Sequence, residues 1–108
     1  MRNLFLAKLS GANLFGANLV EADLVGANLW MAQLAQANLW RAKMAGVDLR
    51  EAYLVGARLT GVDLTGADLR GSEMREVNLS GAVLLGANLD FADLQAAKLC
   101  NMLMPDGQ

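Results

Sequence analysis

The sequence predicts an all-β solenoid in which the chain winds into stacked square coils. Every fifth residue from Leu4 to Met104 is leucine or methionine, twenty-one times in succession. Two places before each of these, between positions 7 and 97, the residue is small and nearly always alanine. Ten of the eleven glycines share a third phase of the same five-residue period.

A period of five fits neither regular secondary structure. On an α-helix each step of five residues turns by about 500°, so the leucines would spiral around the axis. On a β-strand an odd step sends successive leucines to opposite faces. The chain must therefore turn once in every repeat, so that each leucine returns to the interior.

Each five-residue unit has positions with distinct roles, as in Ala12-Asn13-Leu14-Phe15-Gly16. We call the alanine of the unit the inner alanine position, the next residue the outward position and the leucine the centre. The inner alanine position and the centre face inward. The outward position is mostly asparagine or aspartate, which can bond the local backbone. The first and second turn positions follow the centre. Glycine at the second one indicates a type II turn, whose third residue has φ > 0. Where Glu21, Glu51 or Arg41 stands there, we expect another turn type.

One turn of nearly 90° per unit closes a square after four units, or twenty residues. Glycines at this interval support that closure: Gly26, Gly46, Gly66 and Gly86. Successive coils would then stack in register, giving about five coils of four pentapeptides. Because each coil contacts only its neighbours, the two ends are expected to be the least stable parts. Ser72 is the one polar residue in the inward set, and its hydroxyl must bond neighbouring backbone or stay unsatisfied.

Composition bounds the domain organisation and excludes several functions. The 108 residues predict one domain over 1–108, with repeats over about 2–104 and an end segment at 105–108. A net charge of −2 without basic clusters argues against nucleic-acid binding, and no segment suits a membrane span or signal peptide. The lone Cys100 fits a reducing, cytoplasmic location. Histidine is absent, so we expect no enzyme, cofactor or metal site.

The run Gly11-Ala12-Asn13-Leu14-Phe15-Gly16-Ala17-Asn18-Leu19 resembles the pentapeptide-repeat family, whose consensus is A-(D/N)-L-x-x. The resemblance covers residues 4–104 and implies a right-handed quadrilateral β-helix. It also implies no shared catalytic residues. The closing Met104-Pro105-Asp106-Gly107 is similar to the ending of cyanobacterial members, which suggests a bacterial source. Pro105 is expected to stop the coil, because it has no N–H.

Two chemical features have competing interpretations. Stacking at twenty residues places Asp48 beside Asp68, and Glu73 beside Asp93. Such acid pairs suit a cation site or phosphate mimicry, but the arginines at positions 50, 70 and 75 would neutralise them into solvated ladders. Cys100 is either a reactive thiol or, in the better interpretation, inert.

Apolar residues at the corners are the more informative surface feature. Phe5 and Val25 on one edge, and Val20 and Trp40 on the other, flank the face that contains Leu4, Leu24 and Met44. A contiguous apolar patch usually marks an interaction site. The alternative is that these corner residues only cover the interior.

The sequence therefore favours a non-enzymatic scaffold or protein–protein interaction module. Its partner would be another protein or a second copy, in an end-to-end or face-to-face homodimer. The alternative, implied by the family resemblance, is a DNA-mimicking inhibitor or protector of DNA gyrase. That function needs a strongly acidic surface, and a charge of −2 with interspersed arginines falls short of it.

Overall fold

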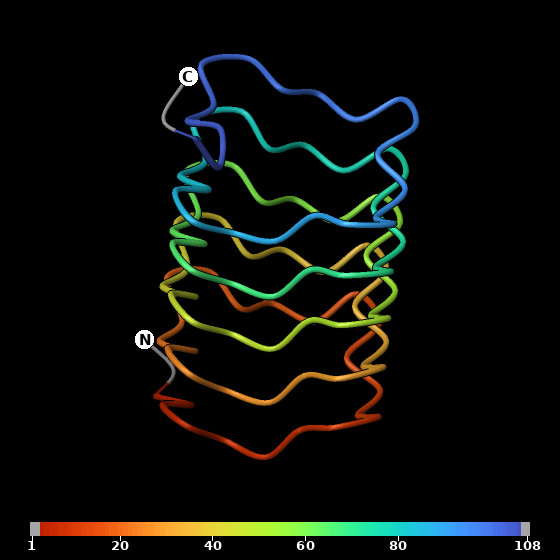
Figure 1. Cartoon of the computed structure of the whole chain (residues 1–108). Helices are drawn as coiled ribbons and strands as arrows, with labels where there is room; N and C mark the ends of the chain where they lie inside the picture. The colour runs from red at the N-terminus through yellow and green to blue at the C-terminus, as the bar shows by residue number, and fades with distance from the viewer. Residues whose placement is uncertain (1–2, 107–108) are drawn as a thin grey trace.

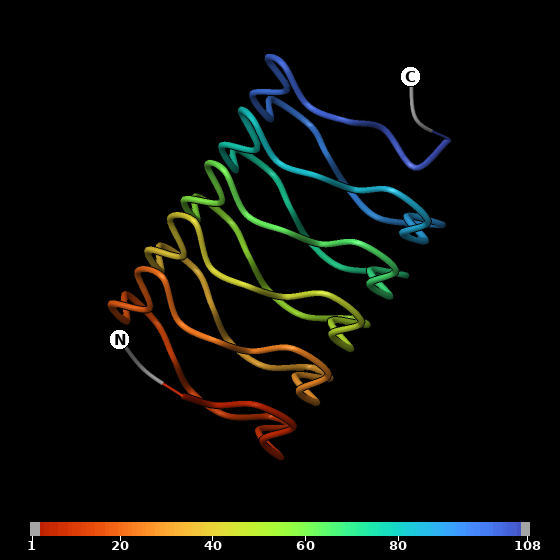
Figure 2. The same cartoon turned by 90° about the vertical axis from the view of Figure 1, so that its left-hand side faces the viewer.

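The computed structural model, which describes residues 3–106, shows a stack of square coils that climbs from the red end to the blue end (Figure 1). The extents are 31 × 21 × 21 Å, so the stack is a short rod with a square cross-section. The view turned by 90° shows the same stacking (Figure 2). The fold is the expected right-handed quadrilateral β-helix.

Residues twenty apart in the sequence pair side by side. Over residues 3–106 there is no helix and no strand longer than a single bridge; each coil contributes one parallel bridge per side. We name the four sides by their bridged residues, all at the outward position. Face 1 holds Asn3, Asp23, Lys43, Asp63, Val83 and Leu103; face 2 Lys8, Asn28, Asp48, Asp68 and Asn88; face 3 Asn13, Gln33, Tyr53, Glu73 and Asp93; face 4 Asn18, Asn38, Arg58, Asn78 and Lys98. Corner 1 follows face 1 along the chain, and corners 2, 3 and 4 follow their faces likewise.

Three backbone hydrogen bonds per unit join one coil to the next. The N–H of a centre donates to the carbonyl of the outward residue one coil later, as from Leu4 to Asp23 at 2.8 Å. The second turn position donates to the first turn position of the next coil, as from Gly26 to Ala45 at 3.0 Å. In the other direction, Asn28 N–H donates to Ala7 at 2.9 Å. This pattern fixes the register of the whole stack.

Every turn from Leu6 to Asn101 has positive φ at its second turn position, whether or not glycine is there. The ten glycines have φ between 65 and 73°, and ten other residues have φ between 55 and 62°. Our expectation of another turn type at Glu21, Glu51 and Arg41 was wrong, since their φ values are 57, 56 and 55°. The reason is the inter-coil ladder: the N–H at this position must point at the next coil.

Asparagine and aspartate recur at the outward position because they satisfy the one N–H that has no backbone partner. Asn13 Oδ1 accepts a hydrogen bond from Phe15 N–H at 3.2 Å, and Asp23 Oδ1 accepts one from Val25 N–H at 3.1 Å. The N–H of the first turn position takes no part in the ladder. Proline at that position is therefore compatible with another coil, and Pro105 does accept a bond from Gly86 N–H through its carbonyl. The expectation that Pro105 ends the coil by lacking an N–H was wrong.

The interior is filled by the centres and inner alanines. From Leu19 to Ala87 both sets are buried, and Met44 and Met74 are fully buried among the leucines. Towards the ends the same positions become partly exposed, at Leu4, Leu9 and Leu14 and again at Leu89 and Leu94. The core therefore thins at both ends, as the nearest-neighbour packing of a solenoid predicts.

Candidate interaction surface

The predicted apolar residues lie on two neighbouring corners of the N-terminal coils. Phe5 and Val25 occupy the first turn position of corner 1 in consecutive coils, and Val20 and Trp40 occupy that of corner 4. Phe5 and Trp40 are exposed, whereas both valines are half-buried. The two corners are separated by face 1, which is three extended residues wide and presents Asp23 and Lys43 there. The structure thus arranges the four residues along the two edges of one face.

Leu6 adds to this surface and was not predicted. It stands at the second turn position of corner 1 with φ of 58°, and its side chain leans over the next coil. A Cβ at Gly26 would lie 2.6 Å from Leu6 Cδ2, so glycine at 26 provides the space that Leu6 occupies. The signal was present in the sequence, since Leu6 is the one leucine in the glycine phase. We call Phe5, Leu6, Val20, Val25 and Trp40 the N-terminal apolar patch.

The turn glycines Gly26, Gly46, Gly66 and Gly86 lie together in corner 1. All four have positive φ, between 66 and 70°. Glycine stacks closely on glycine here, since a Cβ on Gly86 would be 3.9 Å from Gly66 Cα. The corner is therefore flat above Leu6, and it borders the apolar patch. Trp30 lies in corner 2, diagonally opposite Trp40 in corner 4, so the two tryptophans do not form one patch, as expected.

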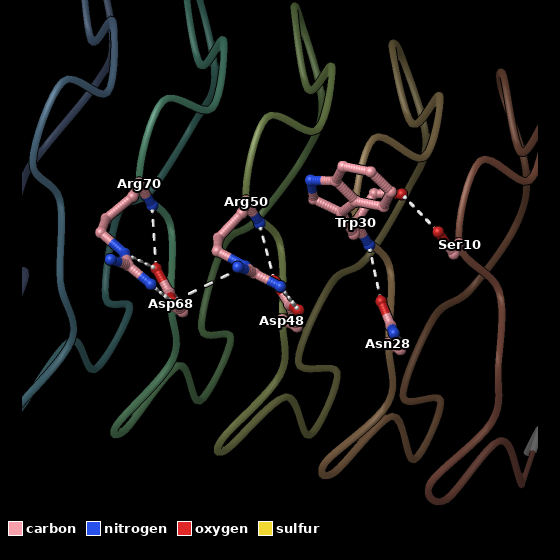
Figure 3. A network of polar contacts seen from close by, with 7 residues as sticks. All are labelled: Ser10, Asn28, Trp30, Asp48, Arg50, Asp68 and Arg70. Carbon is pink, nitrogen blue, oxygen red and sulfur yellow. Dashed lines mark hydrogen bonds and ion pairs between the residues drawn. The ribbon is translucent and has the colours of Figure 1, made fainter.

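A ladder of ion pairs runs along corner 2 (Figure 3). Arg50 binds Asp48 through two hydrogen bonds, from Nε at 2.9 Å and from Nη2 at 2.8 Å. Arg70 binds Asp68 in the same way, at 2.9 and 2.7 Å. Arg50 Nε also lies 3.9 Å from Asp68 Oδ2 and so links the two pairs. The two acids are neighbours, as predicted, and the arginines neutralise them.

Both ladder carboxylates are held in the charged form. The side-chain hydrogen bond from Arg50 lowers the pKa of Asp48, against a smaller opposing effect of burial. The hydrogen bond from Arg70 lowers the pKa of Asp68 in the same way. On the next face Arg75 Nε lies 3.9 Å from Asp93 Oδ2, a looser pair. On face 2 each acid of the pair is therefore opposed by its own arginine, whereas on face 3 the longer contact of Arg75 reaches Asp93.

The remaining candidates from the sequence are possible metal ligands, Cys100, Ser72 and a membrane span. Among residues 3–106, no three or more histidine, cysteine, aspartate or glutamate side chains gather where they could hold a metal ion. Cys100 is exposed and free. Ser72 is fully buried and its Oγ has no hydrogen-bond partner. Of the two outcomes predicted for this hydroxyl, the structure shows the unsatisfied one. No helix within the described residues is long and apolar enough to cross a membrane.

Comparison with known proteins matches this geometry. A family model described as pentapeptide repeats (8 copies) matches residues 3–41, 32–71 and 63–101. One similar solved structure is that of Rfr23, a pentapeptide repeat protein from the cyanobacterium Cyanothece 51142. Its sequence is 33% identical to this one over 82% of this chain and 64% of its own length, and the two structures align with a TM-score of 0.65. A pentapeptide repeat protein from the thylakoid lumen of Arabidopsis thaliana is 33% identical over 83% of this chain and 59% of its own, with a TM-score of 0.60. The similarity thus spans less than two thirds of either solved protein. No curated protein matches the chain.

Proposed function

The chain belongs to the pentapeptide-repeat family, and we propose that it is a non-enzymatic interaction module that presents one side of a rigid rod to a protein partner. The observation that carries this proposal is the N-terminal apolar patch. Three backbone bonds per unit lock successive coils together, so the patch keeps its shape before a partner binds. Surfaces that are already ordered lose less conformational entropy on binding.

The patch has two apolar edges with charged residues between them. Aromatic residues are enriched in protein interfaces relative to the rest of the surface. Phe5 and Trp40 are exposed at the two edges of face 1, while Asp23 and Lys43 lie between them. The guanidinium of Arg41 lies 5.3 Å from the centroid of the Trp40 ring, which holds a cation beside the apolar edge. This arrangement fits a partner with apolar side chains and a few charges of both signs.

Corner residues further along the rod differ in character. Above Val25 corner 1 carries Ala45, Thr65 and the exposed Leu85, and above Trp40 corner 4 carries Thr60 and Ser80. If large corner residues served only to cover the core, they would be needed equally in every coil. Aromatic residues at the first turn position all lie in the first two coils, and this concentration favours a binding surface there.

Paired substitutions test the proposal by partner capture. The Phe5→Ser/Trp40→Ser variant should lose a protein that the wild-type chain captures from a bacterial lysate, because aromatic anchors supply most interface energy. The matched Arg70→Ser/Arg75→Ser variant, also made at first turn positions, should retain it. Far-UV circular dichroism checks that both variants fold. Equal capture by wild type and the Phe5/Trp40 variant would show that these corners only cover the core.

Gyrase inhibition by DNA mimicry is less well supported. Mimicry requires an extended negative surface, but Arg50 and Arg70 each neutralise the acid two residues before them at 2.8 and 2.7 Å. A supercoiling assay with purified gyrase checks this choice: inhibition that disappears in Asp48→Asn/Asp68→Asn would favour the mimic instead.

We also infer a cytoplasmic location, supported by the free and exposed thiol of Cys100, which suits a reducing compartment. Fractionation of the native host would test it, and recovery outside the cytoplasm would contradict it.

A further inference from the structure

Four charged side chains form two rows of opposite sign on face 1. Glu21 stands at the second turn position of corner 4, where the chain enters face 1, and Asp23 follows it at the outward position. We call these two residues the acidic row. One coil later the same two positions carry Arg41 and Lys43, which we call the basic row. Because Asp23 and Lys43 are bridged directly, the two rows lie next to each other along the rod.

These four charges have no ion-pair partner within the described chain. The ion pairs of Asp48, Asp68 and Asp93 lie on faces 2 and 3, and within residues 3–106 none involves the acidic or the basic row. Asp23 uses its Oδ1 to accept a hydrogen bond from the backbone N–H of Val25 at 3.1 Å. On face 2, in contrast, each acid binds its own arginine. The charges of face 1 are therefore available to a second molecule.

A second copy that runs in the opposite direction matches all four charges. Two copies can meet face 1 to face 1 about a two-fold axis that crosses both rods. Each column of residues then meets the same column of the other copy, with the order of the coils reversed. An axis halfway between the two rows places Asp23 against Lys43 of the second copy, and Glu21 against Arg41. Since a two-fold interface repeats every contact, it would hold four ion pairs.

Charge opposes the other ways of placing face 1 on itself. Two copies that run in the same direction would place Asp23 on Asp23 and Lys43 on Lys43, and like charges that face each other are destabilising. In the antiparallel arrangement, an axis at the level of the basic row also places Lys43 on Lys43, and Asp23 on Asp63. An axis between Lys43 and Asp63 pairs these two but places Asp23 against Val83. The charges thus select a single register.

Apolar side chains meet in this same register. At corner 1, Val25 faces Ala45 of the second copy, and Phe5, which is 54% exposed, faces Thr65. The surface beside Thr65 is open, since a Cβ placed on Gly66 would meet nothing within 4 Å. The Phe5 ring of the second copy therefore has room to lie there. Apolar and charged contacts favour the same arrangement.

We infer that the partner of this surface is a second copy of the chain, bound face 1 to face 1 in an antiparallel two-fold dimer. The inference rests on the proposed function, because Phe5 and Val25 belong to the N-terminal apolar patch, and it adds the identity of the partner. Four coils over residues 3–81, at about 4.8 Å each, and a width of 21 Å give about 400 Å² per partner before side chains are added. This is below the roughly 800 Å² per partner of standard interfaces, so the dimer should be reversible.

Sedimentation equilibrium of the full chain from about 1 μM to about 1 mM tests the dimer. The wild type should shift from monomer to dimer and stop there, because a two-fold contact is closed. Lys43→Glu and Asp23→Lys each turn two ion pairs into two repulsions, so each variant alone should associate about tenfold more weakly or worse. An equimolar mixture of the two variants should recover the wild-type constant to within about threefold, because the charges that face each other are then opposite again.

Arg58→Glu is the matched control for Lys43→Glu. It makes the same change of charge at the same unit position and in the same coil, but it lies on face 4 between Asn38 and Asn78. It should therefore leave association unchanged. Circular dichroism confirms folding of each variant. Recovery in the mixture reports a contact between copies, since damage within one chain is not repaired by another.

A wild-type chain that stays monomeric over this range, or that grows beyond a dimer, would overturn the inference. So would a mixture that associates no better than the separate variants. Partner capture distinguishes this failure from failure of the proposed function, because Lys43→Glu retains Phe5 and Trp40. Capture of a different protein by a chain that stays monomeric would support the interaction module and overturn the assignment of a second copy as its partner.

Discussion

Replacing Ser72 by alanine should stabilise the rod. Ser72 is fully buried on face 3, between Ala52 one coil below and Ala92 one coil above, and its Oγ has no partner. Its backbone behaves as in every alanine unit, because its N–H donates to Leu69 at 3.1 Å and its carbonyl accepts from Asp93 at 3.0 Å. Only the hydroxyl distinguishes it from the alanines in its column.

The size of the effect follows from the two changes that the substitution makes. An unsatisfied buried polar group costs about 1–3 kcal/mol, and the small void left by one oxygen costs a few tenths of a kcal/mol at about 24 cal/mol per Å³. Ser72→Ala should therefore raise the free energy of unfolding by about 1 kcal/mol. For a domain of this size that corresponds to a rise in Tm of roughly 4 °C or more.

Thermal and urea denaturation followed by far-UV circular dichroism would measure this change. The control is Ser80→Ala, at a half-buried first turn position, which should stay within about 0.5 kcal/mol of wild type. A Ser72→Ala protein that is less stable than wild type would show that the hydroxyl is bonded in solution and would refute the reasoning.

Three further predictions address the turns, the core and the ion-pair ladder. Glu51→Gly should raise the free energy of unfolding by about 0.5 kcal/mol, measured by urea denaturation. Positive φ strains a residue that has a side chain, and relief of this strain exceeds the cost of glycine's greater freedom in the unfolded chain. A clear loss of stability would contradict this. Met44→Asp places a charge in a fully buried site and should abolish the folded circular dichroism spectrum; a soluble folded protein would disprove the inward orientation of the centres. Asp48→Asn keeps the oxygen that accepts Arg50 N–H but removes the charge. Since the folded-state pKa of Asp48 is lowered, its stabilisation, at most about 1 kcal/mol for this exposed pair, should be present at neutral pH and lost as the pH falls below about 4. Urea melts of both proteins over this range would show it, and a constant difference would refute it.

The fold could be predicted because the five-residue period leaves few alternatives. A leucine that must return to the interior every five residues requires a turn in each unit, and glycine phasing located that turn. The turns at Glu21, Glu51 and Arg41 were mispredicted because propensity was weighed for one residue at a time. In the coil the N–H at this position bonds the next coil, and this repeated tertiary constraint outweighs the local preference for glycine.

The candidate site was only partly predictable. Phe5, Val20, Val25 and Trp40 could be placed on two corners from residue numbers alone, because the register is fixed at twenty. The lean of Leu6 over Gly26 depends on the direction of the side chain at a positive-φ residue, which the pattern of residue types does not give. Pro105 was misread for a related reason: only the hydrogen-bond pattern shows which N–H groups the ladder uses.

The constant pairing distance has a consequence for how the rod is built over time. Each bridge joins residues twenty apart, wherever in the chain it forms. Closing a loop of twenty residues carries the same entropy cost for the first coil as for the last, so added coils lengthen the protein without lengthening its loops. Relative contact order therefore falls as the array grows, and folding should propagate from any formed pair of coils at a speed that is nearly independent of total length.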